Sequence, residues 1–131
     1  MKIQLAYRYT GEDPDKLKEI LKSIIAILEE KGHETYTPIL DSDSSSMSKQ
    51  EIYTDALRKM DDTDILLVYM SSSEKSEGML VELGYALGKD KKVILCVDKT
   101  VDETRVRYFT EDIIEFEDVN DLYDKLKALD I

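Results

Sequence analysis

The chain has 131 residues, 18 of them basic and 29 acidic, and its formal net charge is -11 at pH 7. This length fits one compact domain with a real core, spanning residues 1–131. The negative charge disfavours polymeric nucleic acid and anionic membranes as partners, because both repel it at long range. A small anionic ligand is still compatible with the sequence, because a helix N-terminus or a few local donors can hold one phosphate.

The hydrophobic segments are short. None approaches the roughly 20 apolar residues that span a bilayer, and the chain starts with a short alternating run. We therefore expect a soluble, cytoplasmic protein. Cys96, the only cysteine, lies in an apolar run with no partner for a disulfide or a metal cluster, so we interpret it as an inert core residue.

The first half of the chain is expected to form strand, helix, strand and helix. Residues 2–7 read as a strand, and a loop with Pro14 leads into a helix over 15–31 that Gly32 ends. Residues 33–40 are predicted as a second strand, in which Pro38 favours an edge position. The apolar positions of the first helix recur at helical spacing: Leu17, Ile20, Leu21, Ile24, Ile25 and Leu28.

A polar segment over 41–46 separates this strand from the next helix. It superficially matches a calcium loop, but its sixth position is Ser46 instead of glycine and its twelfth is Ile52 instead of glutamate. We interpret it as a solvated or lid-like loop.

The second half continues the alternation. A helix is predicted over 48–60, with Ile52, Ala56 and Met60 on one face, followed by a strand over 64–70 that is apolar on both faces. The remaining elements are predicted as a helix over 78–88, strands over 92–97 and 113–116, and a helix over 118–129.

Strands that alternate with helices predict an α/β fold with a parallel sheet covered on both faces. Right-handed crossovers favour a flavodoxin-like or Rossmann-like three-layer sandwich with five parallel strands in the order 2-1-3-4-5. In this order a crevice opens at the carboxyl ends of the first and third strands, next to the loops over 8–13 and 71–78.

Glu82 is a lone carboxylate in the otherwise apolar helix over 78–88. Its neighbours three and four residues away include no cation, so the side chain either turns to water or points into a cavity. The alternative is an exposed glutamate that pairs with a lysine from another element.

The residues around Glu82 also follow the spacing Ser-x-Gly-x-x-x-Glu-x-Gly-x-Ala. With Asp64 opening the preceding strand, it resembles the core motif of the nucleoside 2-deoxyribosyltransferase family, which includes the 2′-deoxynucleoside 5′-phosphate N-hydrolases. The resemblance covers most of the chain and implies that Glu82 is the nucleophile, forming a covalent glycosyl-enzyme intermediate. The motif residues are Ser76, Gly78, Glu82, Gly84 and Ala86.

Cleavage of a glycosidic bond also needs an acid for the leaving base. The resemblance gives this role to Asp55, although the alignment needs one inserted residue between Asp55 and Asp64. The alternative is a solvated ion pair, because Arg58 and Lys59 follow three and four residues later.

Ser76 bears on the substrate. The resemblance associates a serine here with the monophosphate hydrolases and an aspartate with transferases that act on free nucleosides. A hydroxyl beside a helix N-terminus, with the N–H of Gly78 nearby, suits a phosphate. The alternative is that Ser76 is only the helix N-cap.

The first loop occupies the family's phosphate- and sugar-binding position. It departs from the Gly-Ser-Ile-Arg-Gly pattern of the hydrolases, since Arg8 stands where serine is usual and Thr10 where arginine is usual. Arg8 remains a candidate cation for the phosphate. Tyr7, Tyr9 and Gly11 complete the candidate substrate-binding loop, although a loop tyrosine is often a packing residue.

These residues predict an N-glycosidase that releases the base from 2′-deoxynucleoside 5′-monophosphates without metal or organic cofactor. The enzymatic alternative is base exchange on free deoxynucleosides, and the non-enzymatic one is a nucleotide-binding or sensing module. The resemblance also implies a homodimer or larger homo-oligomer. Residues 102–108 are the candidate contribution to a neighbouring site, with a surface loop or short helix as the plainer interpretation.

Overall fold

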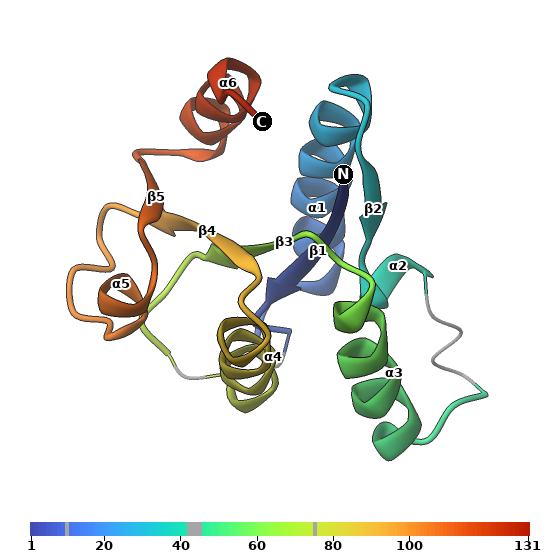
Figure 1. The fold of residues 1–131 in the computed structure, drawn as a ribbon. Helices are drawn as coiled ribbons and strands as arrows, with labels where there is room; N and C mark the ends of the chain where they lie inside the picture. Colours follow the sequence, from blue (N-terminus) through green and yellow to red (C-terminus); the bar gives the residue numbers. More distant parts are fainter. Residues whose placement is uncertain (10, 42–45, 75) are drawn as a thin grey trace.

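The computed structural model describes residues 1–9, 11–41, 46–74 and 76–131. Its strands are β1 (Lys2–Tyr7), β2 (Glu34–Tyr36), β3 (Ile65–Met70), β4 (Lys92–Asp98) and β5 (Asp112–Phe116). Its helices are α1 (Pro14–Glu30), α2 (Pro38–Asp41), α3 (Lys49–Asp61), α4 (Glu77–Gly88), α5 (Val106–Phe109) and α6 (Val119–Ala128). Figure 1 shows how they alternate along the chain.

All strands pair in parallel in the order β2-β1-β3-β4-β5, which confirms the predicted topology. Every residue of the central strand β3 is buried, as the continuous apolar run predicted. The chain winds one way from β1 to β2 and the other way from β3 onwards. The crevice of this fold therefore lies where the carboxyl ends of β1 and β3 meet.

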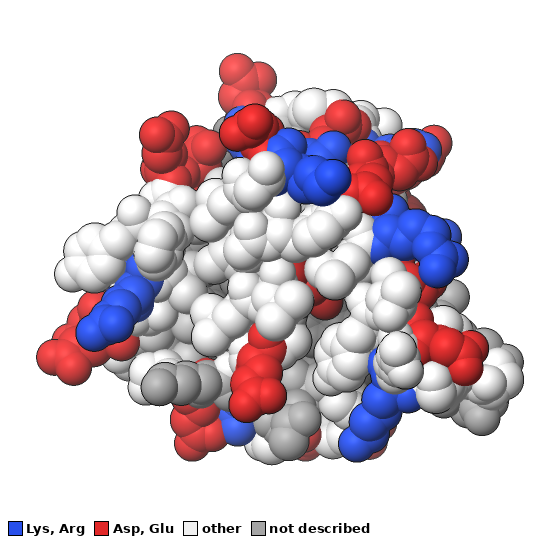
Figure 2. All heavy atoms as spheres, turned by 60° about the horizontal axis from the view of Figure 1, so that its bottom comes forward, with Lys and Arg blue, Asp and Glu red and all other residues white. Residues whose placement is uncertain are grey.

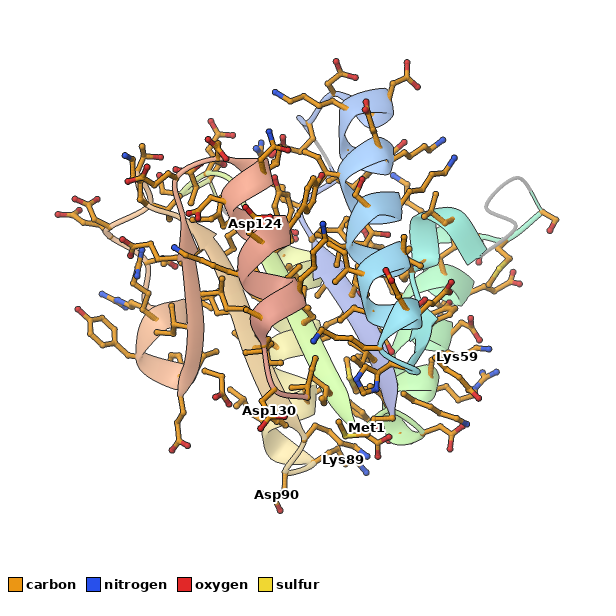
Figure 3. All side chains as sticks on the ribbon, turned by 90° about the horizontal axis from the view of Figure 1, so that it is seen from above. Met1, Lys59, Lys89, Asp90, Asp124 and Asp130 are labelled. Atoms are coloured by element: carbon orange, nitrogen blue, oxygen red, sulfur yellow. The ribbon has the colours of Figure 1, made fainter. Side chains whose placement is uncertain are left out.

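Helices cover both faces of the sheet. On one face α1 and α6 lie side by side, as the view in Figure 3 shows, and close a core built from alternate strand residues such as Ile3, Leu5 and Leu67. On the other face α3 and α4 pack over the opposite set, which includes Ala6, Leu66 and Val68. Cys96 is fully buried in the first of these cores, as predicted.

The second strand is shorter than predicted. It ends at Tyr36, and the segment that begins at Pro38 is the helical turn α2, so the prediction of a strand to Leu40 was wrong. Proline has no N–H for the ladder and a φ near that of a helix, so it suits the first position of a helix better than a strand interior. β2 is nevertheless an edge strand, as Pro38 suggested.

Local sequence signals set the helix boundaries near the site. Asp13 caps α1 by accepting from the N–H groups of Asp15 and Lys16, and Gly32 ends that helix with a φ of +92°. Ser48 and Glu51 form a capping box at the start of α3. Of the predicted polar loop before α3, residues 42–45 lie outside the described part of the chain. Across the described ranges, no helix combines the length and the apolar character needed to cross a membrane.

Candidate active site

The start of α4 lies at the edge of the sheet where β3 ends. Ser76 is the N-cap, and its hydroxyl accepts from the N–H of Met79 at 3.3 Å. Gly78 follows in the first turn beneath the ring of Tyr53, because a Cβ at this position would lie 3.0 Å from Cε1 of that ring. The first turn of α4 is thus in close contact with α3, and the Ser76 side chain caps the helix.

Glu82 lies one turn further along α4, between residues that pack on the sheet. Its Oε2 is buried without a hydrogen-bond partner, and no ion pair to Glu82 occurs among the described residues. Burial raises the pKa of Glu82 from 4.5 to about 7, although a hydrogen bond from the side chain of Gln4 lowers it. The described residues therefore do not show the alternative in which Glu82 pairs with a lysine. With a pKa near 7, both the neutral and the ionised carboxyl group are populated near neutral pH.

Gln4 is a buried polar residue that the sequence analysis did not identify. It is fully buried in β1, and its Nε2 donates to the carbonyl of Ala56 on α3 at 3.1 Å. A glutamine at an inward position of an alternating strand is itself a signal, because a buried amide needs partners. Gln4 therefore links β1 to α3.

Asp55 lies in the middle of α3, with a quarter of its side chain exposed. Its Oδ2 accepts from the hydroxyl of Tyr36 at 3.0 Å, and its Oδ1 lies 3.9 Å from the guanidinium of Arg58. The ion pair suggested by the sequence is therefore present, but it is long. Asp55 is adjacent in the chain to Ala56, the residue that holds the Gln4 amide.

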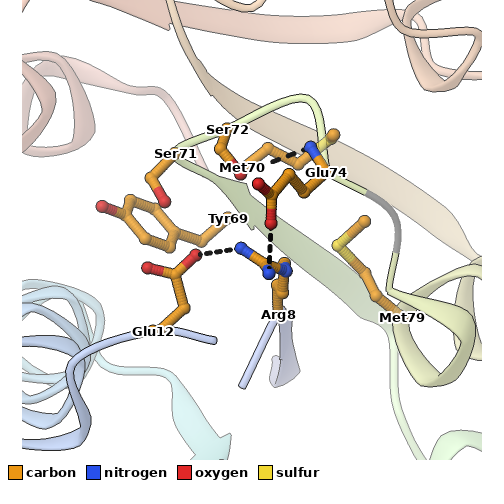
Figure 4. A pocket seen from close by; sticks show the side chains of 8 residues that line it. All are labelled: Arg8, Glu12, Tyr69, Met70, Ser71, Ser72, Glu74 and Met79. Atoms are coloured by element: carbon orange, nitrogen blue, oxygen red, sulfur yellow. Dashed lines mark hydrogen bonds and ion pairs between the residues drawn. The ribbon is translucent and has the colours of Figure 1, made fainter. Parts of the chain in front are cut away.

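Arg8 occupies the crevice beyond β1. Its guanidinium pairs with Glu12 at 3.1 Å and with Glu74 at 2.5 Å, as Figure 4 shows. The cavity around it encloses about 10 Å³, room for about one water molecule. Glu74 is 70% exposed, so this partner is the one that a ligand can most easily displace.

The other loop residues have different surroundings. Gly11 adopts a φ of +87° directly beneath Arg8, where a Cβ would lie within 2.4 Å of Nη2, so glycine is needed both for conformation and for space. Tyr7 is half-buried beside the core under α1, whereas Tyr9 is half exposed. Thr10 lies outside the described residues.

The structure groups the predicted residues into two sets. Ser76 caps α4, which carries Gly78 and Glu82 and packs at Gly78 against Tyr53 of α3, the helix that carries Asp55. Arg8 and Gly11 lie together at the crevice beyond β1. Neither Glu82 nor Asp55 lines the small cavity around Arg8. A larger groove of about 540 Å³ lies on the α1 and α6 face, but its charged lining residues are five carboxylates and one lysine, a balance that disfavours a phosphate.

Within the described ranges, no group of three or more His, Cys, Asp and Glu side chains is placed to hold a metal ion. Tyr69, which lines the cavity around Arg8, has a pKa raised to about 12 by burial, so its hydroxyl stays protonated at neutral pH.

Comparison with known families identifies the family of the chain. The model of the nucleoside 2-deoxyribosyltransferase family matches residues 7–114, which include both helices of the site and the crevice. The chain belongs to the nucleoside 2-deoxyribosyltransferase family. No curated protein matches the sequence significantly.

Solved structures of similar fold include two nucleoside-processing enzymes. The CMP N-glycosidase of Clostridium botulinum is 20% identical, with 98% of each chain covered and a TM-score of 0.75. The 2-deoxyribosyltransferase of Bacillus psychrosaccharolyticus is 23% identical, covering all of this chain and 93% of its own, with a TM-score of 0.70. A deoxyribosyltransferase of Leishmania mexicana has a TM-score of 0.61 at 20% identity, over 84% of this chain and 72% of its own. These likenesses show that the flavodoxin-like fold is shared.

Family membership decides between the classes of function left open by the sequence. This family member is an enzyme of the glycosidase and pentosyltransferase type, which acts on a small nucleoside or nucleotide. The purely binding or sensing module is thereby disfavoured, and the question moves to the substrate and to the residues that act on it.

Proposed function

We propose that this deoxyribosyltransferase-family enzyme hydrolyses the N-glycosidic bond of 2′-deoxynucleoside 5′-monophosphates, with Glu82 as nucleophile and Asp55 as acid. The observation that carries the proposal is the Glu82 carboxylate, which is buried on α4 without an ion pair and has a pKa of about 7. A carboxylate that is poorly solvated and unpaired is a stronger nucleophile than an exposed one, and sites of this kind concentrate at catalytic centres.

The reaction has two steps. In the first, Glu82 forms a bond to the anomeric carbon as the bond from that carbon to the base nitrogen breaks, and Asp55 supplies the proton that the leaving base needs. In the second, water attacks the same carbon, its proton returns to Asp55, and the Glu82 carboxylate is released. The products are free base and deoxyribose 5-phosphate.

The phosphate is proposed to bind at the crevice. Arg8 supplies a guanidinium, and the start of α4 supplies backbone N–H groups and the Ser76 hydroxyl. A phosphate would take the place of Glu74, whose exposed carboxylate is the weaker partner of Arg8. The similar Clostridium botulinum protein is a CMP N-glycosidase, which also supports a nucleoside monophosphate as substrate.

The test is release of free base, followed by chromatography, from the four deoxynucleoside monophosphates, the four deoxynucleosides and CMP. We expect turnover of a deoxynucleoside monophosphate, and loss of at least about 1,000-fold in Glu82→Gln. Glu77→Gln, on the same helix but exposed, should remain active. Full activity of Glu82→Gln would defeat the proposal.

A second candidate is base exchange on free deoxynucleosides. The observation that favours it is the pairing of Arg8 with two carboxylates, which leaves no net positive charge at the crevice. Adding a second base and measuring the exchanged nucleoside separates the two reactions, because only the exchange enzyme passes deoxyribose to the base in preference to water.

We also propose that the enzyme assembles as a homodimer or larger homo-oligomer through the face that carries α3, α4 and α5. Large apolar side chains on these helices are exposed, and they include Tyr53, Leu80, Val81, Tyr108 and Phe109. Figure 2 shows an uncharged central area on this face, bordered by acidic and basic side chains, with acidic atoms at the bottom of a central hollow. Exposed apolar patches of this kind are typical of subunit interfaces.

A further inference from the structure

Tyr36 is the last residue of the edge strand β2, and its side chain reaches α3. Its hydroxyl donates to Oδ2 of Asp55 at 3.0 Å. In the parallel register of the sheet, Tyr36 lies beside Gln4 of β1, whose amide donates to the carbonyl of Ala56 at 3.1 Å. Two neighbouring strands therefore hold two consecutive residues of α3, and the first of these residues is the proposed acid.

The ring of Tyr36 is held by the same helix. The ammonium group of Lys59, four residues after Asp55 on α3, lies 5.1 Å from the centre of the ring, which is within the range of a cation–π contact. A side chain that is held at both its ring and its hydroxyl keeps that hydroxyl in one place. Tyr36 can therefore set the orientation of the Asp55 carboxyl group.

The two carboxyl oxygens of Asp55 have different surroundings. Oδ2 accepts from Tyr36, whereas the contact of Oδ1 among the described residues is the guanidinium of Arg58 at 3.9 Å, whose side chain is 73% exposed. An ion pair this long and exposed holds its partner weakly. In a neutral carboxyl group one oxygen carries the proton and the other only accepts. While Tyr36 donates to Oδ2, the transferable proton of Asp55 is therefore on Oδ1.

We propose that Tyr36 is a positioning residue, which holds Oδ2 of Asp55 so that Oδ1 delivers the proton to the leaving base. In the first step the Oδ1 proton passes to the base as the bond between the base and the anomeric carbon breaks. In the second step Oδ1 takes a proton from the attacking water. Tyr36 keeps its own proton throughout and acts only through Asp55. This inference rests on the proposed function, in which Asp55 is the acid.

The first experiment removes the hydroxyl group alone. Tyr36→Phe keeps the ring that Lys59 contacts, so Asp55 loses its donor while its surroundings are retained. For a deoxynucleoside monophosphate, kcat should fall about tenfold and KM should stay within about twofold of the wild type, because a well-positioned acid accelerates the chemical step. Tyr85→Phe is the matched control. It removes another hydrogen bond from a tyrosine to an aspartate of α3, at 2.6 Å to Asp61, and should leave kcat unchanged.

The second experiment separates positioning from a structural role. A 2-deoxyribose 5-phosphate that carries a 4-nitrophenyl group at its anomeric oxygen has a leaving group that departs as a stable anion, without a proton from the enzyme. Tyr36→Phe should change its release by less than about twofold, and Asp55→Asn should show the same contrast between substrates with a larger loss on the natural ones. If Tyr36 only tied β2 to α3, its variant would slow both kinds of substrate equally. Equal losses, or no loss on either substrate, overturn the inference.

The third experiment measures the contact without turnover. Carbon NMR of protein labelled at the tyrosine Cζ atoms identifies the Tyr36 signal by its absence in Tyr36→Phe. This signal should move when acid protonates the Asp55 carboxylate, and the movement should be missing in Asp55→Asn. A Tyr36 signal that does not respond overturns the inference. A wild-type protein that releases neither base nor nitrophenolate would instead overturn the proposed function, even where the NMR measurement shows the contact.

Discussion

At the scale of single residues, Glu82 combines two requirements that conflict in the folded protein. Its proposed chemistry needs the ionised form, whereas burial favours the neutral form and raises its pKa to about 7. The carboxylate therefore destabilises the fold at the pH at which it would react. A strained or poorly solvated group of this kind is typical of residues kept for function.

This conflict predicts a pH-dependent gain in stability for Glu82→Gln. Between pH 4.5 and 7 the folded state keeps a proton that the unfolded state releases, so the wild-type free energy of unfolding falls as pH rises through this window. Glutamine has nearly the same shape and no charge. The variant should be more stable than the wild type by on the order of 2–3 kcal/mol at pH 8, and by much less at pH 5.

Urea unfolding at both pH values measures the difference, with Glu77→Gln as control. Glu77 is exposed on the first turn of the same helix, so its removal should give no comparable gain at pH 8. Equal stability of wild type and Glu82→Gln at pH 8 would show that the carboxylate is solvated.

The same residues show what sequence reasoning could reach. Sequence reasoning identified Glu82 because it is a lone carboxylate in an apolar helix, and a charge in such a helix needs an explanation. In the structure its Oε2 is buried. Gln4 was missed, because its role depends on a partner from another element: Ala56, which accepts its hydrogen bond, lies on α3, 52 positions away. Contacts of this range depend on how the helices pack and not on local spacing.

At the scale of elements, the strands and helices were predictable where their periodicity was long. The order of the sheet followed from the alternation of strands with helices and the handedness of crossovers, and it was confirmed. The second strand was not, because an edge strand of three residues carries too little periodicity to locate its end. At this position the single residue Pro38 determined where the helical turn begins, although the surrounding pattern predicted a longer strand.

At the start of α4, Ser76 has two candidate roles, helix cap and phosphate ligand, and a substitution can distinguish them. Aspartate caps a helix about as well as serine, so Ser76→Asp should keep the free energy of unfolding within about 0.5 kcal/mol of the wild type. It adds a negative charge where the phosphate is proposed to bind, so KM for a deoxynucleoside monophosphate should rise at least about tenfold. Deoxynucleosides without phosphate should be unaffected.

Steady-state kinetics with both substrate classes checks this, and Ser76→Ala is the matched variant. Alanine loses the hydrogen bond to Met79 and should cost about 1 kcal/mol of stability without adding a charge. If Ser76→Asp leaves KM for the monophosphate unchanged, the phosphate binds elsewhere and Ser76 serves only as the cap.

At the scale of the whole molecule, the distribution of charge is uneven. The chain carries a net charge of -11, yet the face formed by α3, α4 and α5 has an uncharged central area bordered by charged side chains (Figure 2). Like-charged surfaces repel a second copy except where such a face allows close approach. Tyr108 is 86% exposed and Phe109 61% exposed on α5, which is unusual for aromatic side chains without a partner surface.

The proposed assembly therefore predicts that charges placed on α5 dissociate it. Both side chains are exposed, so Tyr108→Asp with Phe109→Asp should leave the fold of one chain intact. Analytical ultracentrifugation should then give the mass of one chain for this variant and a multiple of it for the wild type. Ala26→Asp, at an exposed position of α1 on the other side of the sheet, should leave the assembly unchanged. If a neighbouring subunit completes the site, base release by the double variant should also fall with the assembly, whereas a wild-type mass of one chain would rule out the interface.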